Sequence, residues 1–233
     1  MELLRKAETK ENENKVFAKG YCFAKIFLFF VVGCVVGTYY EQLLEFFKFN
    51  VWVRRSGLIY GPFNPVYGLG AISFVVLLGK NYKKRKWVAN YSLSCLIGGA
   101  IEYLLSLAQE YIFHSKSWSY GKAVLNIGGR TTVPFMLVWG IGGMLVMYVI
   151  YPIFSKIIEE IPYQPAKLLY TGLLIFMSFN IVISGTALLR QRERLEGKAA
   201  DTFLDRVCDT VYDDQFLKKA YPNYKILEFE DQE

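Results

Sequence analysis

Five long apolar segments limit what this chain can fold into more than any other feature. Most of them reach the roughly 20 residues that a helix needs to cross the hydrocarbon of a bilayer. The composition agrees, because 53% of the residues are hydrophobic and the mean hydropathy is +0.23, which is too apolar for an ordinary soluble domain. The segments are residues 22–47, 66–79, 88–113, 133–154 and 166–189. The sequence therefore predicts an all-α, multi-pass membrane protein with about five transmembrane helices.

The segment at 66–79 is short by itself, and the stretch before it is unusual. Residues 55–70 read RSGLIYGPFNPVYGLG, with two prolines and four glycines. Adding this stretch restores the length needed to cross, so we predict that it belongs to the crossing. Irregular backbone at membrane depth must be covered by protein or line a wet cavity, because its N–H and C=O groups need partners. We therefore expect this stretch to form one wall of a site.

Polar segments flank the apolar region at both ends. Residues 1–20 are predicted to be a polar N-terminal tail rather than a signal peptide, because no short apolar core with a cleavage site follows the charges. Residues 21–189 form the predicted transmembrane domain. Residues 190–233 form a polar C-terminal tail with apolar residues at helical spacing, namely Phe203, Leu204, Val207 and Val211. That pattern predicts an amphipathic helix that lies on the membrane surface or docks a partner.

Positive charge does not fix the orientation of the chain. The loop KNYKKRK at 80–86 and the N-terminal tail carry five positive charges each, which places both on the cytoplasmic side. Five crossings would then put RQRER at 190–194 outside, where the same rule disfavours it. Either the rule fails at one end, or one apolar segment is re-entrant, with 58–79 as the candidate. The net charge of +6 fits basic loops facing anionic lipid, so the lipid bilayer is a predicted partner and nucleic acid is not.

Motifs for catalysis or cofactor binding are not found in the sequence. It contains neither a G-x-x-x-x-G-K-[ST] phosphate loop nor a G-x-S-x-G nucleophile turn. The only histidine, His114, is expected at a helix end as a polar cap. The four cysteines are dispersed, at Cys22, Cys34, Cys95 and Cys208, which indicates neither a disulfide framework nor a zinc site. We predict no catalytic residue, no metal and no cofactor, and we do not expect the chain to be an enzyme by itself.

The first two apolar segments and the next two share an order of features. In each pair, a helix with two glycines and two carboxylates precedes a loop arginine, a proline, an aromatic-Gly-x-Gly step and a second helix. The first set is Gly33, Gly37, Glu41, Glu45, Arg54, Arg55, Pro65 and Tyr67 to Gly70; the second is Gly98, Gly99, Glu102, Glu110, Arg130, Pro134 and Trp139 to Gly142. The order predicts a parallel repeat with its axis along the membrane normal. Chance or the general glycine enrichment of membrane helices is the alternative.

Charged side chains inside the apolar segments are the main candidate site residues. A carboxylate or arginine at membrane depth is costly, so it normally faces inward and is paired. Glu102 lies near the middle of its segment, and Glu41 and Glu45 share one helix face. Arg55 and Arg130 are natural partners, since an arginine fork can meet a carboxylate in two hydrogen bonds. Such pairs would either bind substrate or only hold two helices in register.

Aromatic and amide residues beside these charges complete the predicted site. Trp118 and Tyr120 lie in SWSYG at 117–121, where they either contact a ligand or anchor a helix at the headgroup boundary. The irregular starts of the second and fourth helices are expected to close the site. The predicted substrate-binding set is Glu41, Arg55, Asn64, Tyr67, Glu102, Trp118, Tyr120, Arg130 and Trp139.

In these motifs the chain resembles a family of bacterial membrane proteins, the CmpB-like type IV ABC-transporter permeases. The resemblance runs from about residue 23 to residue 227, and its most specific part is the Gly-Pro-x-x-Pro-x-Tyr-Gly core. It is carried by Gly37 to Glu41, SGLIYGPFNPVYGLG, Glu102, WSY, GGRTTVPFMLVWGIGG and the tail pieces FLD, D and LKKAYPN. The chain departs from the family at Thr38, where a tryptophan is common, and at Arg55-Ser56-Gly57, where the family reads Asn-Arg-Gly. The second departure leaves open whether Arg54 or Arg55 takes the place of the family arginine.

The resemblance implies a multi-pass protein of the bacterial plasma membrane with a role in transport. A chain with about five helices is small for a complete permease. The resemblance therefore implies an ATPase on a separate chain, together with a second copy of this chain in a homo-oligomer or another partner. It supplies no catalytic or binding residues.

Three functions are compatible with the sequence. The first is a permease-like transporter subunit with a Glu/Arg-lined site inside the membrane. The second is a membrane enzyme that acts on a lipid or polyisoprenoid headgroup, with the carboxylates as base or cation ligands and the arginines on phosphate. The third is an accessory protein whose charge pairs are only structural. A cavity open sideways to lipid would favour the enzyme, whereas one open to water on alternate sides would favour transport.

Overall fold

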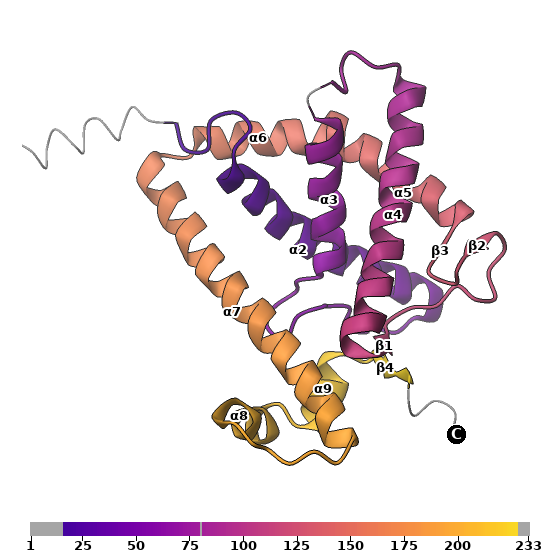
Figure 1. Ribbon diagram of the computed structural model, residues 1–233. Helices are drawn as coiled ribbons and strands as arrows, with labels where there is room; N and C mark the ends of the chain where they lie inside the picture. The colour runs from indigo at the N-terminus through magenta and orange to yellow at the C-terminus, as the bar shows by residue number, and fades with distance from the viewer. Residues whose placement is uncertain (1–15, 80, 228–233) are drawn as a thin grey trace, which may run out of the picture.

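The computed structural model describes residues 16–79 and 81–227, and the fold is almost wholly helical (Figure 1). The helices are α2 (Phe23–Phe49), α3 (Pro65–Leu78), α4 (Trp87–Phe113), α5 (Val133–Leu145), η1 (Val146–Ile150), α6 (Tyr151–Glu160), α7 (Tyr163–Leu195), α8 (Phe203–Val211) and α9 (Asp214–Ala220). Four short strands are β1 (Ser115–Lys116), β2 (Asn126–Ile127), β3 (Thr131–Thr132) and β4 (Lys225–Ile226). Strand β1 pairs antiparallel with β4, and β2 pairs antiparallel with β3.

Four of the described helices are long and apolar enough to cross a membrane. They are α2, α4, α7 and the continuous helix Val133–Glu160 formed by α5, η1 and α6. The prediction of a helical, multi-pass membrane protein is therefore confirmed. Helix α3 has 14 residues and a length of about 21 Å, short of the roughly 30 Å of bilayer hydrocarbon. A fifth crossing thus depends on the irregular segment before α3.

Helices α3 and α5 begin in the same way. The Oδ1 atom of Asn64 accepts a hydrogen bond from the Val66 N–H at 3.1 Å, and the Oγ1 atom of Thr132 accepts one from the Phe135 N–H at 3.1 Å. Each helix also carries a proline in its first turn. Polar caps and early prolines favour helix starts because the first N–H groups have no partner within the helix. Both caps therefore end an irregular loop and start an apolar helix.

The irregular segment before α3 is covered by α7. The side-chain amide of Asn180 accepts from the Tyr60 N–H at 3.1 Å and donates to the Tyr60 carbonyl at 2.8 Å. The Ser184 hydroxyl accepts from the Ile59 N–H at 2.9 Å, and Arg54 donates to two carbonyls of the segment. Buried peptide groups need hydrogen-bond partners, and α7 supplies several of them. The fold therefore tolerates the proline- and glycine-rich sequence without extending α3.

Glycines bring α3 against α2 and α5 against α4. A Cβ at Gly37 would lie 2.1 Å from Cγ of Tyr67, and a Cβ at Gly98 would lie 2.3 Å from Cβ of Trp139. Only a residue without a Cβ allows so close an approach of two helices. The second helix of each pair in turn places a glycine against a cysteine of the first, Gly68 against Cys34 and Gly140 against Cys95. Both pairs are therefore packed at backbone distance.

The helix Val133–Glu160 contains a π-helical stretch, η1. The Tyr151 N–H bonds the carbonyl of Val146, five residues earlier. Pro152 follows directly, and a proline inside a helix has no N–H and crowds the carbonyl four residues before it. The wider π turn accommodates the proline ring and keeps the helix continuous.

A buried lysine ties the first turn of α2 to α6. The Lys25 side chain is 0% exposed, its Nζ donates to Ser155 Oγ at 2.7 Å, and it forms an ion pair with Glu159.

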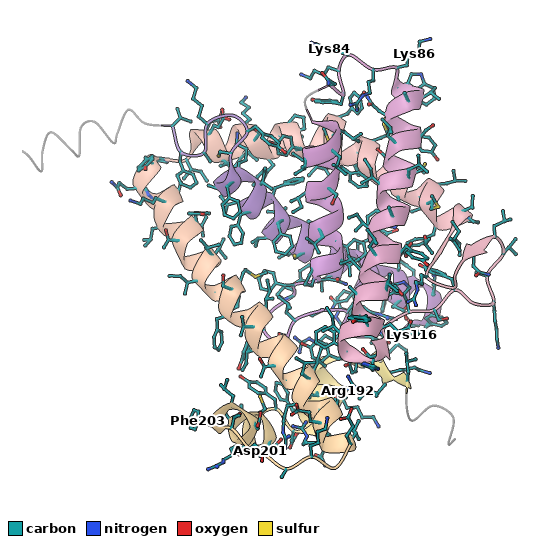
Figure 2. The ribbon with its side chains drawn as sticks, viewed as in Figure 1. Lys84, Lys86, Lys116, Arg192, Asp201 and Phe203 are labelled. Carbon is teal, nitrogen blue, oxygen red and sulfur yellow. The ribbon has the colours of Figure 1, made fainter. Side chains whose placement is uncertain are left out.

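The basic loop with Lys84 and Lys86 lies at the opposite end of the molecule from Arg192 (Figure 2). The two basic clusters that give conflicting orientations therefore do not face the same end.

The C-terminal tail folds against the end of α7. Arg190 is 3% exposed, and its Nε and Nη2 each donate to a carboxylate oxygen of Asp209 at 2.9 Å. Arg194 contacts Asp209 at 2.9 Å and Asp214 at 2.6 Å. The predicted tail helix is present as α8, with its apolar residues Phe203, Leu204 and Val211 exposed. The buried cluster beneath the ion pairs is formed by Ile59, Ala187, Cys208, Leu217 and Tyr221 with their neighbours.

Candidate functional site

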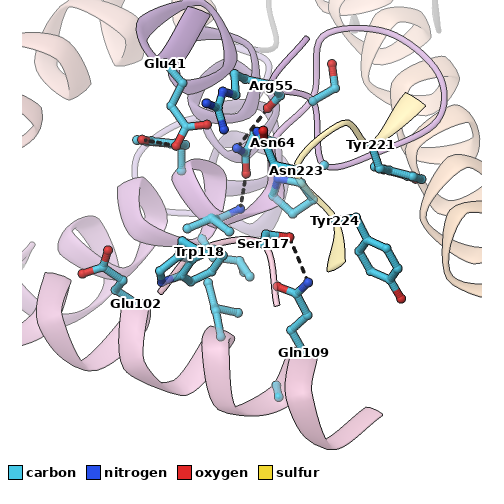
Figure 3. Close-up of a pocket in the computed structure, with 18 of the residues that line it drawn as sticks. Glu41, Arg55, Asn64, Glu102, Gln109, Ser117, Trp118, Tyr221, Asn223 and Tyr224 are labelled. Atoms are coloured by element: carbon cyan, nitrogen blue, oxygen red, sulfur yellow. Dashed lines mark hydrogen bonds between the residues drawn. The ribbon is translucent and has the colours of Figure 1, made fainter. Parts of the chain in front are cut away.

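One cavity gathers most of the predicted site residues (Figure 3). It has a volume of about 360 Å³, within the range of about 300–1,000 Å³ that small-molecule sites have. The loop before α3, the loop before α5 and the C-terminal tail all contribute to its wall. Eight of the nine predicted residues line it: Glu41, Arg55, Asn64, Tyr67, Glu102, Trp118, Tyr120 and Trp139. Arg130 lies outside the lining.

Glu102 is held by two neutral hydroxyl groups. It projects from α4 and is 4% exposed. The Tyr120 hydroxyl donates to Oε1 at 2.8 Å, and the Thr131 hydroxyl donates to Oε2 at 2.6 Å. Burial, together with the nearby carboxylate, raises the pKa of Tyr120 above its ordinary value, so this residue stays protonated as a donor. Each carboxylate oxygen of Glu102 therefore has one uncharged donor.

Glu41 is the second carboxylate of the cavity. The Tyr67 hydroxyl, from the first turn of α3, donates to its Oε1 at 2.9 Å. Since the Tyr67 ring packs on Gly37, one turn before Glu41, the close packing of α2 and α3 also positions this donor. Within residues 16–79 and 81–227, neither Glu41 nor Glu102 forms an ion pair. The cavity thus holds two carboxylates with no basic side chain bound to them.

The loop arginines pair with other glutamates. Arg55 Nη2 lies 2.6 Å from Glu45 Oε1, and Arg130 Nη1 lies 2.7 Å from Glu110 Oε2. Arg130 also donates to the Ser106 hydroxyl at 3.3 Å. Glu45 lies about one helical turn beyond Glu41, and Glu110 about two turns beyond Glu102. The two arginines therefore form their ion pairs one to two helical turns farther along α2 and α4 than the two carboxylates of the cavity.

A third polar group, the indole N–H of Trp139, also faces Glu102. It is buried and makes no hydrogen bond of normal geometry to a described residue, but it acts on the Glu102 carboxylate as a weak donor. Trp118, by contrast, donates its indole N–H to the Arg130 carbonyl at 3.1 Å. The Glu102 carboxylate is thus surrounded by three neutral donors, the Tyr120 and Thr131 hydroxyls and the Trp139 indole.

Several lining residues are not evident from the sequence. Gln109 on α4 donates to the Ser117 hydroxyl at 2.8 Å, and the tail adds Tyr221, Asn223 and Tyr224 to the wall. The pairing of β4 with β1, with Ile226 opposite Ser115, brings this part of the tail to the cavity. The motif LKKAYPN of the family resemblance includes two of these residues. No local pattern places a tail against a loop so distant in sequence.

An apolar groove adjoins the cavity. It has a volume of about 340 Å³ and lies between α2, α3 and α5. The described residues that line it are glycine, alanine, aliphatic or aromatic residues, among them Phe29, Val36, Phe74, Ile141, Gly142 and Leu145. Tyr67, Phe135 and Trp139 line both the cavity and the groove. The two spaces therefore meet at one aromatic wall.

The fold defines a helical protein with several helices long and apolar enough to cross a membrane, and the site turns carboxylates into a cavity between them. No curated protein and no solved structure matches the chain. A family model does match: the chain belongs to the family described as "Putative ABC-transporter type IV", whose model covers residues 28–185, more than half of the sequence. The family membership that the motifs predicted is thus confirmed.

Proposed function

We propose that the chain is a transporter-like membrane subunit that binds an organic ammonium group between Glu41 and Glu102. A separate ATPase chain would supply the energy, as the family description suggests. One observation carries this proposal: both carboxylates turn into a single cavity, and their hydrogen bonds come from neutral donors rather than from a basic side chain.

The energetics of burial support a cationic ligand. A carboxylate at membrane depth is costly and is normally balanced by a positive charge. Arg55 and Arg130 form their ion pairs with Glu45 and Glu110 rather than with Glu41 or Glu102, and only the charge of Arg55 also acts on Glu41. A cation entering the cavity would be attracted by two carboxylates in a poorly hydrated site, and the charges of Arg54 and Arg55 in the same lining would reduce that attraction.

The aromatic residues support the same class of ligand. The cavity is lined by the rings of Tyr67, Tyr120 and Trp139 beside the two carboxylates. The negative face of an aromatic ring attracts an ammonium group by about 0.5–2 kcal/mol, and such rings form the usual sites for quaternary ammonium ions. An organic ammonium group therefore satisfies both the charges and the rings.

We also propose that the chain crosses the membrane five times and contains a parallel repeat of α2–α3 and α4–α5. The packing supports this, because the two pairs make the same contacts. In each pair, an aromatic side chain of the second helix packs on a glycine of the first, and a glycine of the second helix packs on a cysteine of the first. The same separation of 61 residues relates Gly37 to Gly98, Cys34 to Cys95 and Glu41 to Glu102. Each half of the repeat would then supply one carboxylate to the cavity.

The substitution Glu102→Gln should weaken the binding of an organic cation at least about tenfold. The amide has the shape of the carboxylate but no charge, and interactions with a charged group contribute about 1.5–3 kcal/mol. Binding of radiolabelled tetramethylammonium to the purified protein in nanodiscs measures the effect. Size-exclusion chromatography of the variant checks that it remains inserted and folded.

The matched control for this experiment is Glu110→Gln. Glu110 lies on the same helix, but its carboxylate pairs with Arg130 outside the cavity lining. This variant should keep the tetramethylammonium affinity of the unmodified protein. Equal affinity in Glu102→Gln and the unmodified protein, or no saturable binding to either, would contradict the proposed function.

A membrane enzyme acting on a lipid headgroup is the second candidate, and the apolar groove is the observation that favours it. A site that continues sideways into an apolar groove is suited to a lipid substrate. Purification from membranes separates the two functions. A stoichiometric ATPase on the purified protein supports the permease, whereas turnover of added lipid by this chain alone supports the enzyme.

A further inference from the structure

The apolar groove beside the cavity opens away from the protein core. At its rim, Val36 on α2 is 55% exposed and Ile141 on α5 is 64% exposed. Both residues lie within helices long and apolar enough to span a membrane. Exposed aliphatic residues in such helices face hydrocarbon, so the groove is accessible from the bilayer.

The inner side of the groove meets the carboxylate cavity. The ring of Tyr67 lines the groove, while its hydroxyl donates to Glu41 in the cavity. Trp139 also lines both spaces, and its indole N–H faces Glu102. One continuous site thus has a polar end, with carboxylate, arginine and aromatic side chains, and an apolar end.

We propose that the ligand of this site is an amphiphile, with an organic ammonium head in the cavity and a single hydrocarbon tail in the groove. This rests on the proposed function, which assigns the cavity to an ammonium group, and it adds the class of molecule that carries that group. The head is fixed by Glu41 and Glu102, and the tail lies along α2, α3 and α5. A ligand of this class enters from the bilayer rather than from water.

A hydrocarbon tail fits the groove better than a helix of a second copy. A packed helix would leave the two carboxylates behind the aromatic wall without a ligand. A tail attached to an ammonium head occupies both spaces at once.

Gly142 provides a way to fill the groove without disturbing the fold. It lines the groove, and a Cβ added there would meet no atom within 4 Å. The side chain of Gly142→Leu would therefore extend into the space proposed for the tail. Gly172 on α7 is the matched control, because a Cβ there also meets no atom within 4 Å and it lines neither the cavity nor the groove.

The test uses dodecyltrimethylammonium with a photoreactive diazirine in the middle of its chain. The probe is added to the full chain in phosphatidylglycerol nanodiscs, whose lipid has no ammonium group. The sample is irradiated, and the labelled residues are identified by mass spectrometry. We expect labelling at groove residues such as Val36, Ile141 and Leu145 in the unmodified protein and in Gly172→Leu. Labelling of these residues should fall at least fivefold in Gly142→Leu and in Glu102→Gln, and a neutral dodecanol probe should label them weakly.

The outcomes separate this inference from the proposed function. Equal labelling of Gly142→Leu and Gly172→Leu, or labelling spread evenly over the helices, would overturn the placement of the tail. Probe-independent crosslinks between two copies across the groove would also overturn it, because the occupant would then be a second copy. If tetramethylammonium still binds in a Glu102-dependent way in either case, the proposed function stands and only the amphiphile is excluded.

Discussion

Gly98→Ala should lower the free energy of unfolding by about 3 kcal/mol. The new methyl group would lie 2.3 Å from Cβ of Trp139, an atom attached directly to the backbone of α5, so no change of rotamer relieves the contact. Overpacking costs about 1–3 kcal/mol and more where the backbone must move, and this exceeds the gain of up to about 1 kcal/mol in helix propensity. The expected result is a large fall in the thermal unfolding midpoint of the detergent-solubilised protein.

Two further variants test the same packing. Gly37→Ala should be equally damaging, because its methyl group would lie 2.1 Å from Cγ of Tyr67. Gly172→Ala is the control, since nothing lies within 4 Å of a Cβ at that position, and it should leave stability unchanged or slightly raised. A Gly98→Ala protein as stable as Gly172→Ala would show that α4 and α5 are not packed at backbone distance.

Asp209→Ala should detach the C-terminal tail from α7. Arg190 would remain buried without the carboxylate that accepts two of its hydrogen bonds, and removing one partner of a buried ion pair costs about 3–5 kcal/mol. Trypsin should then cleave within the tail at least about tenfold faster, because cleavage follows the population of the open form. Since Tyr221 and Tyr224 line the cavity, tetramethylammonium should also bind more weakly.

The control for the tail is Asp201→Ala. Asp201 is exposed and lies on the same segment, before α8 (Figure 2). Its replacement should leave the rate of tail cleavage unchanged. If Asp209→Ala and Asp201→Ala were cleaved at the same rate, the arginine cluster at the end of α7 would not hold the tail.

Docking of the tail should withstand all but strongly acidic conditions. Hydrogen bonds from Arg190, and then from Arg194, lower the pKa of Asp209 from 3.8 to about 2. Because the folded pKa lies below the unfolded one, the contribution of Asp209 is complete above about pH 4 and is lost as the pH falls toward 2. Hydrogen exchange of the α8 and α9 amides, corrected for the intrinsic rate, should show constant protection from about pH 5 to pH 8. If protection were lost within that range, a titrating group other than Asp209 would govern the docking of the tail.

Much of the helical framework could be predicted from the sequence, because a membrane permits few alternatives to a helix. The apolar segment 88–113, for example, corresponds to α4 at Trp87–Phe113. The prolines of the segment before α3 likewise indicated irregular backbone. Its partner Asn180 could not be identified, because the hydrogen bonds to Tyr60 span 120 residues and leave no local pattern.

The candidate site could be predicted in part for similar reasons. Glu41 and Glu102 stand out because charges at membrane depth are costly, and both line the cavity. The level at which each arginine reaches a helix depends on the path of its loop, so its pairing with Glu45 or Glu110 could not be read from spacing alone. The tail reaches the cavity wall through the pairing of β4 with β1, two segments far apart in the sequence. Such a pairing leaves no periodic pattern in the sequence.

The π turn η1 fixes the rotational phase between two faces of one helix. One residue more or less in a helix turns everything beyond it by about 100°. On the near side of the turn, Trp139 and Gly143 face α4; on the far side, Ser155 and Glu159 face Lys25 of α2. The extra residue of the π turn therefore sets the angle between the helix face that lines the cavity and the face that binds Lys25. A change in the length of 146–150 would rotate one face relative to the other.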